Sequence, residues 1–224
     1  MKVAIMQPYF FPYIGYFQLI HAVDIYVNMD HVSFMKRSYM TRNTLKDNTA
    51  FNVNVWNGSQ NKSCDEVMVN FSQDYTNTLL KKINHFYAKS PHYSNILEKI
   101  ILPEFIEREI SIAQFNISII KRVCNYLDIH TKIIETSTQF ENLDLKREAG
   151  LKSITKQLNG TDYINAIGGQ ALYSKEDFRE NGINLHFLKM GDVGFDDPYA
   201  SILDLMFRYD KEYLIRELKK YTLI

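Results

Sequence analysis

The segment from residue 36 to residue 43 holds the densest group of side chains that could bind a charged ligand. Lys36, Arg37 and Arg42 fall within it. Guanidinium groups bind phosphate oxygens in a bidentate geometry, and an ammonium group binds them as a point charge. We interpret these cations as a clamp for a diphosphate; the alternative is ordinary surface charge on a loop. Asn43 is predicted to orient a substrate hydroxyl, or else to hold a turn.

Asp30 and His31 follow a predicted strand and have the side chains needed for proton transfer. An imidazole changes protonation near neutral pH, and a carboxylate can accept a proton or bind a ribose or sugar hydroxyl. The alternatives are a strand-terminating cap for Asp30 and a structural hydrogen bond for His31. We therefore predict Asp30, His31 and Asn43 as the residues that face the reacting group.

The first thirty residues form a predicted strand, loop, helix, strand unit. A short apolar run, residues 2–6, leads into an aromatic and proline-rich loop, an apolar helical pattern over 17–23 and a second strand over 24–27. In such units a ligand binds beyond the carboxyl end of the strand, where the helix N-terminus favours an anion. We predict that Gly15 lets the backbone approach a phosphate and that the Gln7 amide contacts the ligand. Tyr9, Tyr13 and Tyr16 could stack on a base or sugar, although Tyr16 could instead be core.

A second glycine turn, at Gly168 and Gly169, follows a predicted strand and precedes a predicted helix. A ligand can approach the backbone closely at such a turn, so we add both glycines and Tyr173 to the predicted binding residues. Ser174 is predicted to cap the following helix, with Asp177 as its partner. A further basic patch, Lys146 and Arg147 near Asp144, is either a second binding patch or a charged helix start.

Strands alternate with helices through both ends of the chain, which favours an α/β fold with a mainly parallel sheet and helices on both faces. We predict one domain, residues 1–224, in which residues 75–130 form a helical layer or insertion. The two alternating segments 51–55 and 67–71 are predicted to pair as antiparallel strands. Further strands are predicted at 132–136, 163–167 and 182–188. Helices are predicted at 79–87, 96–101, 110–127, 142–159, 174 onward and 202–207, followed by a charged terminal helix.

The composition is electrically balanced, with 26 basic and 26 acidic residues in 224. No global field favours nucleic acid or an anionic membrane, so we expect no nucleic-acid partner. Cys64 and Cys124 have no Cys or His at metal-ligand spacing, and we predict no metal site and a reducing, cytoplasmic location. No transmembrane segment is predicted. A homodimer is compatible with the sequence.

The chain resembles the WbqC-like family of bacterial proteins along most of its length. The most specific part of the resemblance is the stretch from Met6 to Phe17, MQPYFFPYIGYF. Where the family pattern usually has two acids, at position 30 and the next one, this chain has His31. Further matching positions are Asp30 and Val32, Lys36-Arg37, Arg42-Asn43, residues 116–120, Gly168-Gly169 with Tyr173, and residues 201–204.

The family is associated with the synthesis of O-antigen and other surface glycans. The resemblance therefore implies a cytoplasmic enzyme acting on an activated sugar. The opening unit is also similar, more weakly, to the first strand and helix of nucleotidylyltransferases, where a His-x-Gly-His motif stabilises phosphates. Here the corresponding residues are Tyr13, Gly15 and Tyr16, and a tyrosine carries no positive charge.

The leading hypothesis is a transferase that acts on a nucleotide-linked amino sugar, by N-acyl or aminoacyl transfer, with the nucleotide as part of the substrate and no separate cofactor. One alternative is an ATP-dependent nucleotidylyltransferase or ligase that activates a small acid. The other is a non-catalytic partner of a glycosyltransferase complex, which would use the aromatic loop as a binding surface.

Overall fold

The computed structural model describes residues 1–141 and 148–224. Its centre is a six-stranded sheet in the order β10-β9-β8-β1-β2-β7. All neighbouring pairs are parallel except β9 and β10. The strands are β1 (Lys2–Met6), β2 (Ile25–Asn28), β7 (Lys132–Ile134), β8 (Asp162–Ala166), β9 (Asn184–Met190) and β10 (Tyr221–Leu223).

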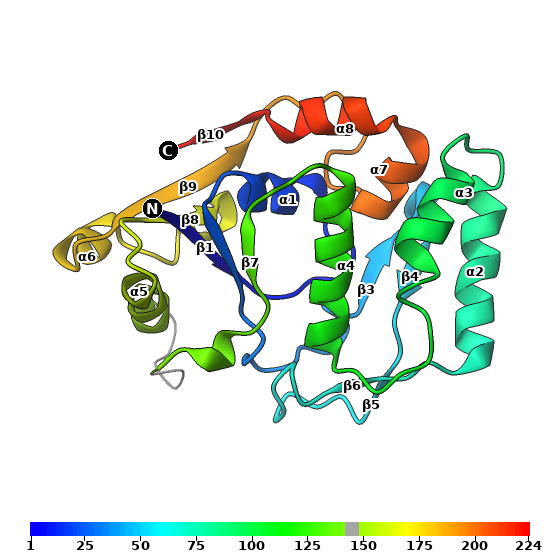
Figure 1. Cartoon of the computed structure of the whole chain (residues 1–224), viewed down its shortest axis with the longest axis horizontal. Helices are drawn as coiled ribbons and strands as arrows, with labels where there is room; N and C mark the ends of the chain where they lie inside the picture. The colour runs from blue at the N-terminus through cyan, green and yellow to red at the C-terminus, as the bar shows by residue number, and fades with distance from the viewer. Residues whose placement is uncertain (142–147) are drawn as a thin grey trace.

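Helices cover both faces of this sheet, as the alternating sequence pattern predicted (Figure 1). The helices are α1 (Ile14–His21), α2 (Gln73–Tyr87), α3 (Tyr93–Ile96), the π-helical turn η2 (Leu97–Ile101), α4 (Ile112–Tyr126), α5 (Glu148–Gln157), α6 (Lys175–Glu180), α7 (Ile202–Arg208) and α8 (Lys211–Leu218).

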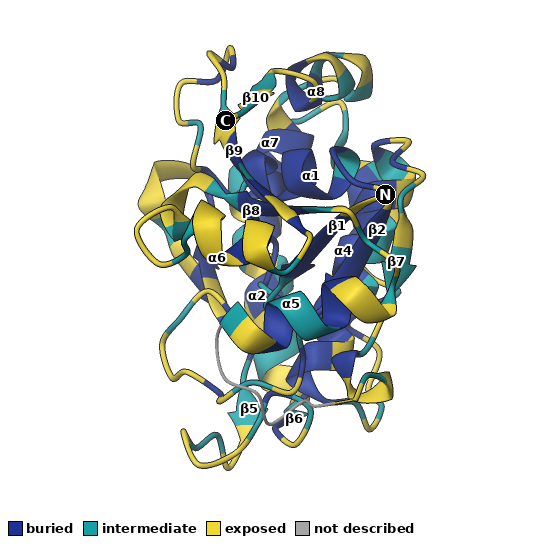
Figure 2. Ribbon diagram, turned by 90° about the vertical axis from the view of Figure 1, so that its left-hand side faces the viewer, coloured by how far each residue is buried: buried dark blue, intermediate teal, exposed yellow. Residues whose placement is uncertain are grey.

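Two apolar clusters divide the core between the faces. Leu151 and Ile154 of α5 and Phe178 of α6 pack against alternate residues of β1 and β2, such as Val3 and Val27. The intervening strand residues belong to the larger cluster, which contains α1, α4, α7 and α8. Figure 2 shows α5 and α6 in front of the sheet, with α1 and α4 behind it. This alternation follows from the twofold side-chain period of a strand.

The chain between β2 and α4 builds a region beside the sheet. It contains two small antiparallel pairs and the helices α2, α3 and η2 (Figure 1). α4 follows this region and leads to β7, so it is the crossover helix between the parallel strands β2 and β7. The pairs are β3 (Arg42–Thr44) with β4 (Ala50–Asn52), and β5 (Val55–Trp56) with β6 (Met68–Val69).

Strand pairing differs in one place from the prediction that segment 51–55 pairs with 67–71. Only its last part does so, since Val55 lies opposite Val69. The first part pairs instead with the segment before it, where Phe51 lies opposite Asn43. Alternation in a sequence identifies a strand but not its partner, which is set by turns and packing.

The capping prediction at Ser174 is confirmed, and α5 ends in a left-handed residue. The Ser174 hydroxyl accepts a hydrogen bond from the Asp177 backbone N–H at 3.3 Å, which caps α6. Asn159 has a φ of +58°, the left-handed conformation that ends α5. The sequence pattern missed β10, a three-residue strand antiparallel to β9.

Candidate functional site

The order of the strands identifies one place where a ligand can enter. Numbered along the chain, the five parallel strands lie in the order 5-4-1-2-3, so the connections from β1 and β8 leave the sheet in opposite directions. In doubly wound sheets the ligand crevice lies at this switch point, beyond the carboxyl ends of the two strands. In this protein the loops after Met6 and Ala166 border that position.

A cavity of about 340 Å³ lies there, and we call it the switch-point cavity. Apolar side chains from β1, α5 and the end of β2 form part of its wall, while Gln7, Asn165 and Tyr173 contribute polar atoms. Among the described residues, no charged side chain lines it. The full lining is Ile5, Met6, Gln7, Tyr9, Met29, Leu151, Tyr163, Asn165, Ala166, Gly168, Gly169, Leu172 and Tyr173.

The two glycines of this cavity have different local surroundings. A Cβ atom added to Gly169 would lie 2.8 Å from Nδ2 of Asn165, so this position has no room for a side chain unless Asn165 moves. A Cβ atom at Gly168 would meet no protein atom within 4 Å. Gly168 therefore leaves its backbone open toward the cavity, as a ligand-binding turn requires.

A second cavity, of about 330 Å³, lies beside the first, and we call it the tyrosine cavity. Its lining is Tyr9, Pro12, Tyr13, Tyr39, Asn43 and Tyr199. Tyr9 lines both cavities. The Tyr9 ring lies 6.1 Å from that of Tyr39, and the Tyr13 ring lies 5.6 Å from that of Tyr199. Tyr9 therefore forms a shared wall.

Buried side chains hold the loop between the cavities in a fixed shape. Phe11 has a φ of +44°, a left-handed conformation that is rare for a bulky residue. Its carbonyl oxygen accepts hydrogen bonds from Asn43 Nδ2 at 2.7 Å and from Ser201 Oγ at 3.0 Å. Asn116 Nδ2 donates to the Pro8 carbonyl at 3.1 Å. The surrounding structure thus imposes the loop conformation in the absence of a ligand.

Two predicted ligand contacts, Tyr16 and Gly15, are packed against other parts of the protein. Tyr16 is buried, lines neither cavity, and donates a hydrogen bond to the Gln7 carbonyl at 2.7 Å. Its hydroxyl also pairs with that of Tyr26. A side chain at Gly15 would collide with the Tyr13 ring, so the space that the glycine leaves is filled by this ring.

Asp30 is also occupied within the protein. The carboxylate is buried, and its Oδ1 accepts hydrogen bonds from the Ser137 backbone N–H at 2.8 Å and the Ser137 hydroxyl at 2.7 Å. Asn43 uses its amide on the backbone carbonyls of the aromatic loop, although it also lines the tyrosine cavity. Both residues are therefore tied into the fold by side-chain hydrogen bonds.

His31 is half exposed, and its Nδ1 lies 3.2 Å from Asp65 Oδ2. This pairing orients the ring, with Nε2 as the other ring nitrogen. Met29, two residues earlier, lines the switch-point cavity. His31 therefore follows the carboxyl end of β2, the strand next to β1, although it lines neither cavity.

Lys36, Arg37 and Arg42 are exposed and line neither cavity. Within residues 1–141 and 148–224 they form no ion pair. The loop that carries Lys36 and Arg37 also carries Tyr39, whose backbone carbonyl accepts a hydrogen bond from the Phe10 N–H at 2.7 Å. The predicted phosphate clamp is therefore attached to the rim of the tyrosine cavity and not to its interior.

Burial affects the phenol groups of three tyrosines that line the cavities. Burial is the main cause that raises the pKa of Tyr9, of Tyr13 and of Tyr173 above that of an ordinary tyrosine. At neutral pH these hydroxyls can donate hydrogen bonds, and their rings offer stacking faces. The two cavities are therefore suited to uncharged rings that carry hydroxyl or amide groups.

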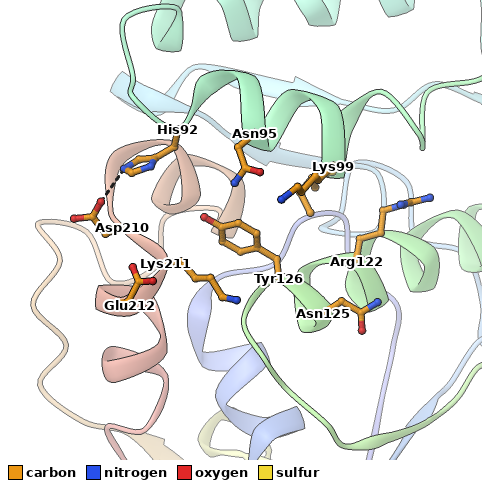
Figure 3. A pocket seen from close by; sticks show the side chains of 10 residues that line it. His92, Asn95, Lys99, Arg122, Asn125, Tyr126, Asp210, Lys211 and Glu212 are labelled. Carbon is orange, nitrogen blue, oxygen red and sulfur yellow. Dashed lines mark ion pairs between the residues drawn. The ribbon is translucent and has the colours of Figure 1, made fainter.

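A third concave surface, which we call the Tyr126 groove, lies between α3, η2, α4 and the start of α8 (Figure 3). Its volume is about 510 Å³, and the Tyr126 ring lies at its centre. His92 and Asp210 form an ion pair within the lining, while Arg122 pairs with Glu104 and Lys211 with Asp128, both outside it. No glycine turn after a strand of the sheet lines this groove, whereas Gly168 and Gly169 line the switch-point cavity. We therefore favour the switch point as the candidate site.

Several residues of the two cavities were not predicted as ligand contacts from the sequence. Asn165 is the second-last residue of β8, just before the glycine turn, and that position could have revealed it. Tyr39 lies in the basic segment and Tyr199 in a polar loop, but no spacing connects them with Tyr9. Lys146, Arg147 and Asp144 lie outside the described residues. No cluster of three or more metal-ligating side chains occurs in the part of the chain that the structure describes, and none of its helices is long and apolar enough to cross a membrane.

Comparison with known proteins gives a family but no established activity. The model of the WbqC-like protein family matches residues 7–215. The uncharacterized protein Rv1507c of Mycobacterium tuberculosis is 25% identical over 223 residues, which cover 94% of this chain and 95% of that protein. No solved structure matches the chain.

Proposed function

The chain belongs to the WbqC-like protein family, and we propose that it is a cytoplasmic transferase that acts on a nucleotide-linked amino sugar in the synthesis of bacterial surface polysaccharide. The proposed reaction is N-acyl or aminoacyl transfer to the sugar amine. The observation that carries the proposal is the uncharged cavity at the switch point of the sheet, beside the open backbone of Gly168. Nucleotides bind at this position in doubly wound sheets.

The polar groups of the switch-point cavity suit a nucleoside. Gln7 and Asn165 present side-chain amides, which can pair with the donors and acceptors of a base edge. Met29, Leu151 and Leu172 offer apolar contacts to the base. The exposed Lys36, Arg37 and Arg42 supply positive charge for the phosphates from the neighbouring loop. The ligand would thus meet neutral groups at its rings and cations only at its phosphates.

His31 is the proposed general base. Asp65 holds its Nδ1, which favours the tautomer with a free lone pair on Nε2. In the proposed step the amine nitrogen bonds to the acyl carbon of an activated acyl donor such as a thioester, His31 Nε2 takes the amine proton, and the C–S bond breaks as the thiolate leaves and receives that proton. His31→Gln should therefore lower turnover by roughly 10²-fold and leave nucleotide-sugar binding unchanged. Unchanged turnover in this variant would remove His31 from the mechanism.

Isothermal titration calorimetry with UDP- and dTDP-linked amino sugars tests the binding step. Gly168→Ala is the informative variant, because Gly168 lines the switch-point cavity and its new methyl group meets no protein atom. We expect binding to weaken by about tenfold or more, equivalent to at least about 1.4 kcal/mol. Asn125→Ala, an exposed change in the Tyr126 groove, is the control and should bind as the unmodified protein does. No binding to any nucleotide or nucleotide sugar would contradict the proposal.

A second candidate is nucleotide-dependent activation of a small acid. It is favoured by the opening β1-α1-β2 unit, which we propose to be nucleotidylyltransferase-like, with Tyr13 at the start of α1 lining the tyrosine cavity. It is disfavoured by the burial of Tyr16, which stands where a phosphate-binding histidine would be needed. Acid-dependent release of pyrophosphate from ATP would support this alternative. A homodimer also remains a proposal, which light scattering of the purified protein would test.

A further inference from the structure

The two cavities are separated by a single tyrosine. The switch-point cavity and the tyrosine cavity have similar volumes, about 340 and 330 Å³, and Tyr9 lines both. Its hydroxyl donates a hydrogen bond to Gln7 Oε1 at 3.2 Å, so the Tyr9 side chain is linked to the first cavity while its ring faces Tyr39 of the second. Ligand pockets of this size hold a small molecule or one part of a larger one. This arrangement suits a ligand with two rings joined by a linker.

The tyrosine cavity has an unusual rim. Tyr39 and Tyr199 are 64% and 69% exposed, although large aromatic side chains are among those most stabilised by burial. Both come from loops, and each faces a more buried tyrosine of the cavity wall, Tyr9 or Tyr13. The two exposed rings therefore flank a concave surface on which a ligand ring could cover them.

The chemistry of the lining selects the kind of ring. Among the described residues, no charged side chain lines the tyrosine cavity, so a phosphate or a carboxylate would lose its hydration without gaining a partner. Phenol groups offer aromatic faces to the C–H side of a pyranose and hydroxyls to its polar edge. A hydroxylated ring that carries no phosphate or carboxylate matches this lining.

The cavity is also shaped before a ligand arrives. Asn43, which forms part of its wall, uses its amide to hold the carbonyls of Phe10 and Phe11. The backbone N–H of Ile202 donates to the Pro12 carbonyl at 3.0 Å, so the residue after Tyr199's loop is tied to the same wall. Little ordering is left to occur on binding, which favours affinity.

We infer that the tyrosine cavity is the subsite for the sugar ring, and that the nucleotide-linked sugar extends across Tyr9 with its nucleoside in the switch-point cavity. This inference rests on the proposed function and adds a location for each half of the substrate. It also assigns a binding role to Tyr199, which no sequence motif indicated.

Calorimetric titration of Tyr199→Ala with two kinds of ligand tests the inference. The ligands are the UDP- and dTDP-linked amino sugars, and UDP and dTDP alone. We expect the variant to bind the nucleotide sugars about tenfold more weakly and the free diphosphates as the unmodified protein does. Trp56→Ala removes another exposed aromatic ring, which is 59% exposed and lines neither cavity, and should change neither affinity.

The possible results separate the inference from the proposed function. If the unmodified protein binds none of these ligands, the proposed function fails and the inference fails with it. If it binds them but Tyr199→Ala weakens both ligand kinds equally, or neither, the sugar subsite is overturned while the proposed function stands. Tyr39→Ala is a second variant at the same rim and should repeat the selective loss. Circular dichroism confirms that each exposed substitution leaves the fold intact.

Discussion

The two cavities that share Tyr9 differ from the Tyr126 groove in the charge of their lining side chains. The described residues that line the two cavities include no charged side chain, whereas the groove is lined by three cations, two carboxylates and a histidine (Figure 3). Of the groove's charged groups, His92 pairs with Asp210 within the lining, and Arg122 and Lys211 pair with acidic residues outside it. The cavities instead present amides, phenols and open backbone. The groove is larger than either cavity taken alone, but the chemistry of the lining favours the cavities.

The two regions also differ in what supports them. The loop between the cavities is held by buried amide groups, among them Asn43 and Asn116. The groove is bordered by ion pairs such as that of Lys211 with Asp128, which are partly exposed. Buried hydrogen bonds are costly to remove, whereas exposed ion pairs contribute little to stability. Substitutions in the two regions should therefore differ in their effects on stability and on binding.

The largest effect is expected from Asn116→Ala. Its amide donates to the carbonyls of Pro8 and Met40, at 3.1 and 2.8 Å, and both carbonyls would lose this donor. We expect the free energy of unfolding to fall by about 2–4 kcal/mol, measured by urea denaturation. Asn125→Ala, on the same helix α4 but exposed in the groove, should change it by less than about 0.5 kcal/mol. Equal losses in the two variants would contradict the comparison.

A smaller effect is expected when the exposed basic loop is neutralised. The double change Lys36→Ala and Arg37→Ala should weaken nucleotide-sugar binding by about tenfold at low salt and reduce its salt dependence, because phosphate contacts are screened by ions. The double change Lys99→Ala and Lys211→Ala in the groove should do neither. Salt-dependent titrations of both variants decide the matter. A loss of binding in the groove variant alone would move the phosphates to the Tyr126 groove.

Lys211→Ala is expected to have a small effect on folding. The lysine pairs with Asp128 at 2.8 Å, but both side chains are substantially exposed, so solvent screens the pair. We expect the free energy of unfolding to change by less than about 1 kcal/mol. A loss as large as that of Asn116→Ala would show that the groove is built as firmly as the cavities.

The smallest change concerns pH. Burial raises the pKa of Tyr9 and of Tyr13, and it raises that of Tyr16 well above the ordinary value. The folded protein therefore favours the neutral phenols. Their contribution to stability is fully present below the unfolded tyrosine pKa of about 10 and is lost as the pH rises through the folded values.

Ligand affinity in the cavities should accordingly change less than about twofold between about pH 7 and pH 9, as far as these tyrosines are concerned. Unfolding should set in above about pH 10, and tyrosinate absorbance followed together with circular dichroism would detect it. Titration of the tyrosines at their ordinary pKa without loss of structure would show that their burial is not maintained in solution.

The sequence predicted that loops far apart in the chain belong to one site. The loops after two apolar strands were expected to bind a ligand, and the structure places Gln7 and Gly168 in one cavity because the carboxyl ends of β1 and β8 are neighbours. Tyr39 and Tyr199 join them only through packing of distant loops, which periodicity does not encode. Asn43 was predicted to face a substrate. A sequence pattern cannot show whether an amide binds the ligand or donates to a backbone carbonyl, as Asn43 does to Phe11, a residue with a positive φ.

The hydrogen bond from Ser201 to Phe11 has a consequence for the order of assembly. The aromatic loop near the N-terminus depends on Ser201 Oγ for one of the two bonds to its strained carbonyl. During synthesis the loop therefore emerges long before this partner, and closing such a long separation is slow. We expect nascent chains arrested before residue 201 to contain β1 and α1 without a finished cavity. The site is thus completed late, by a segment at the far end of the chain.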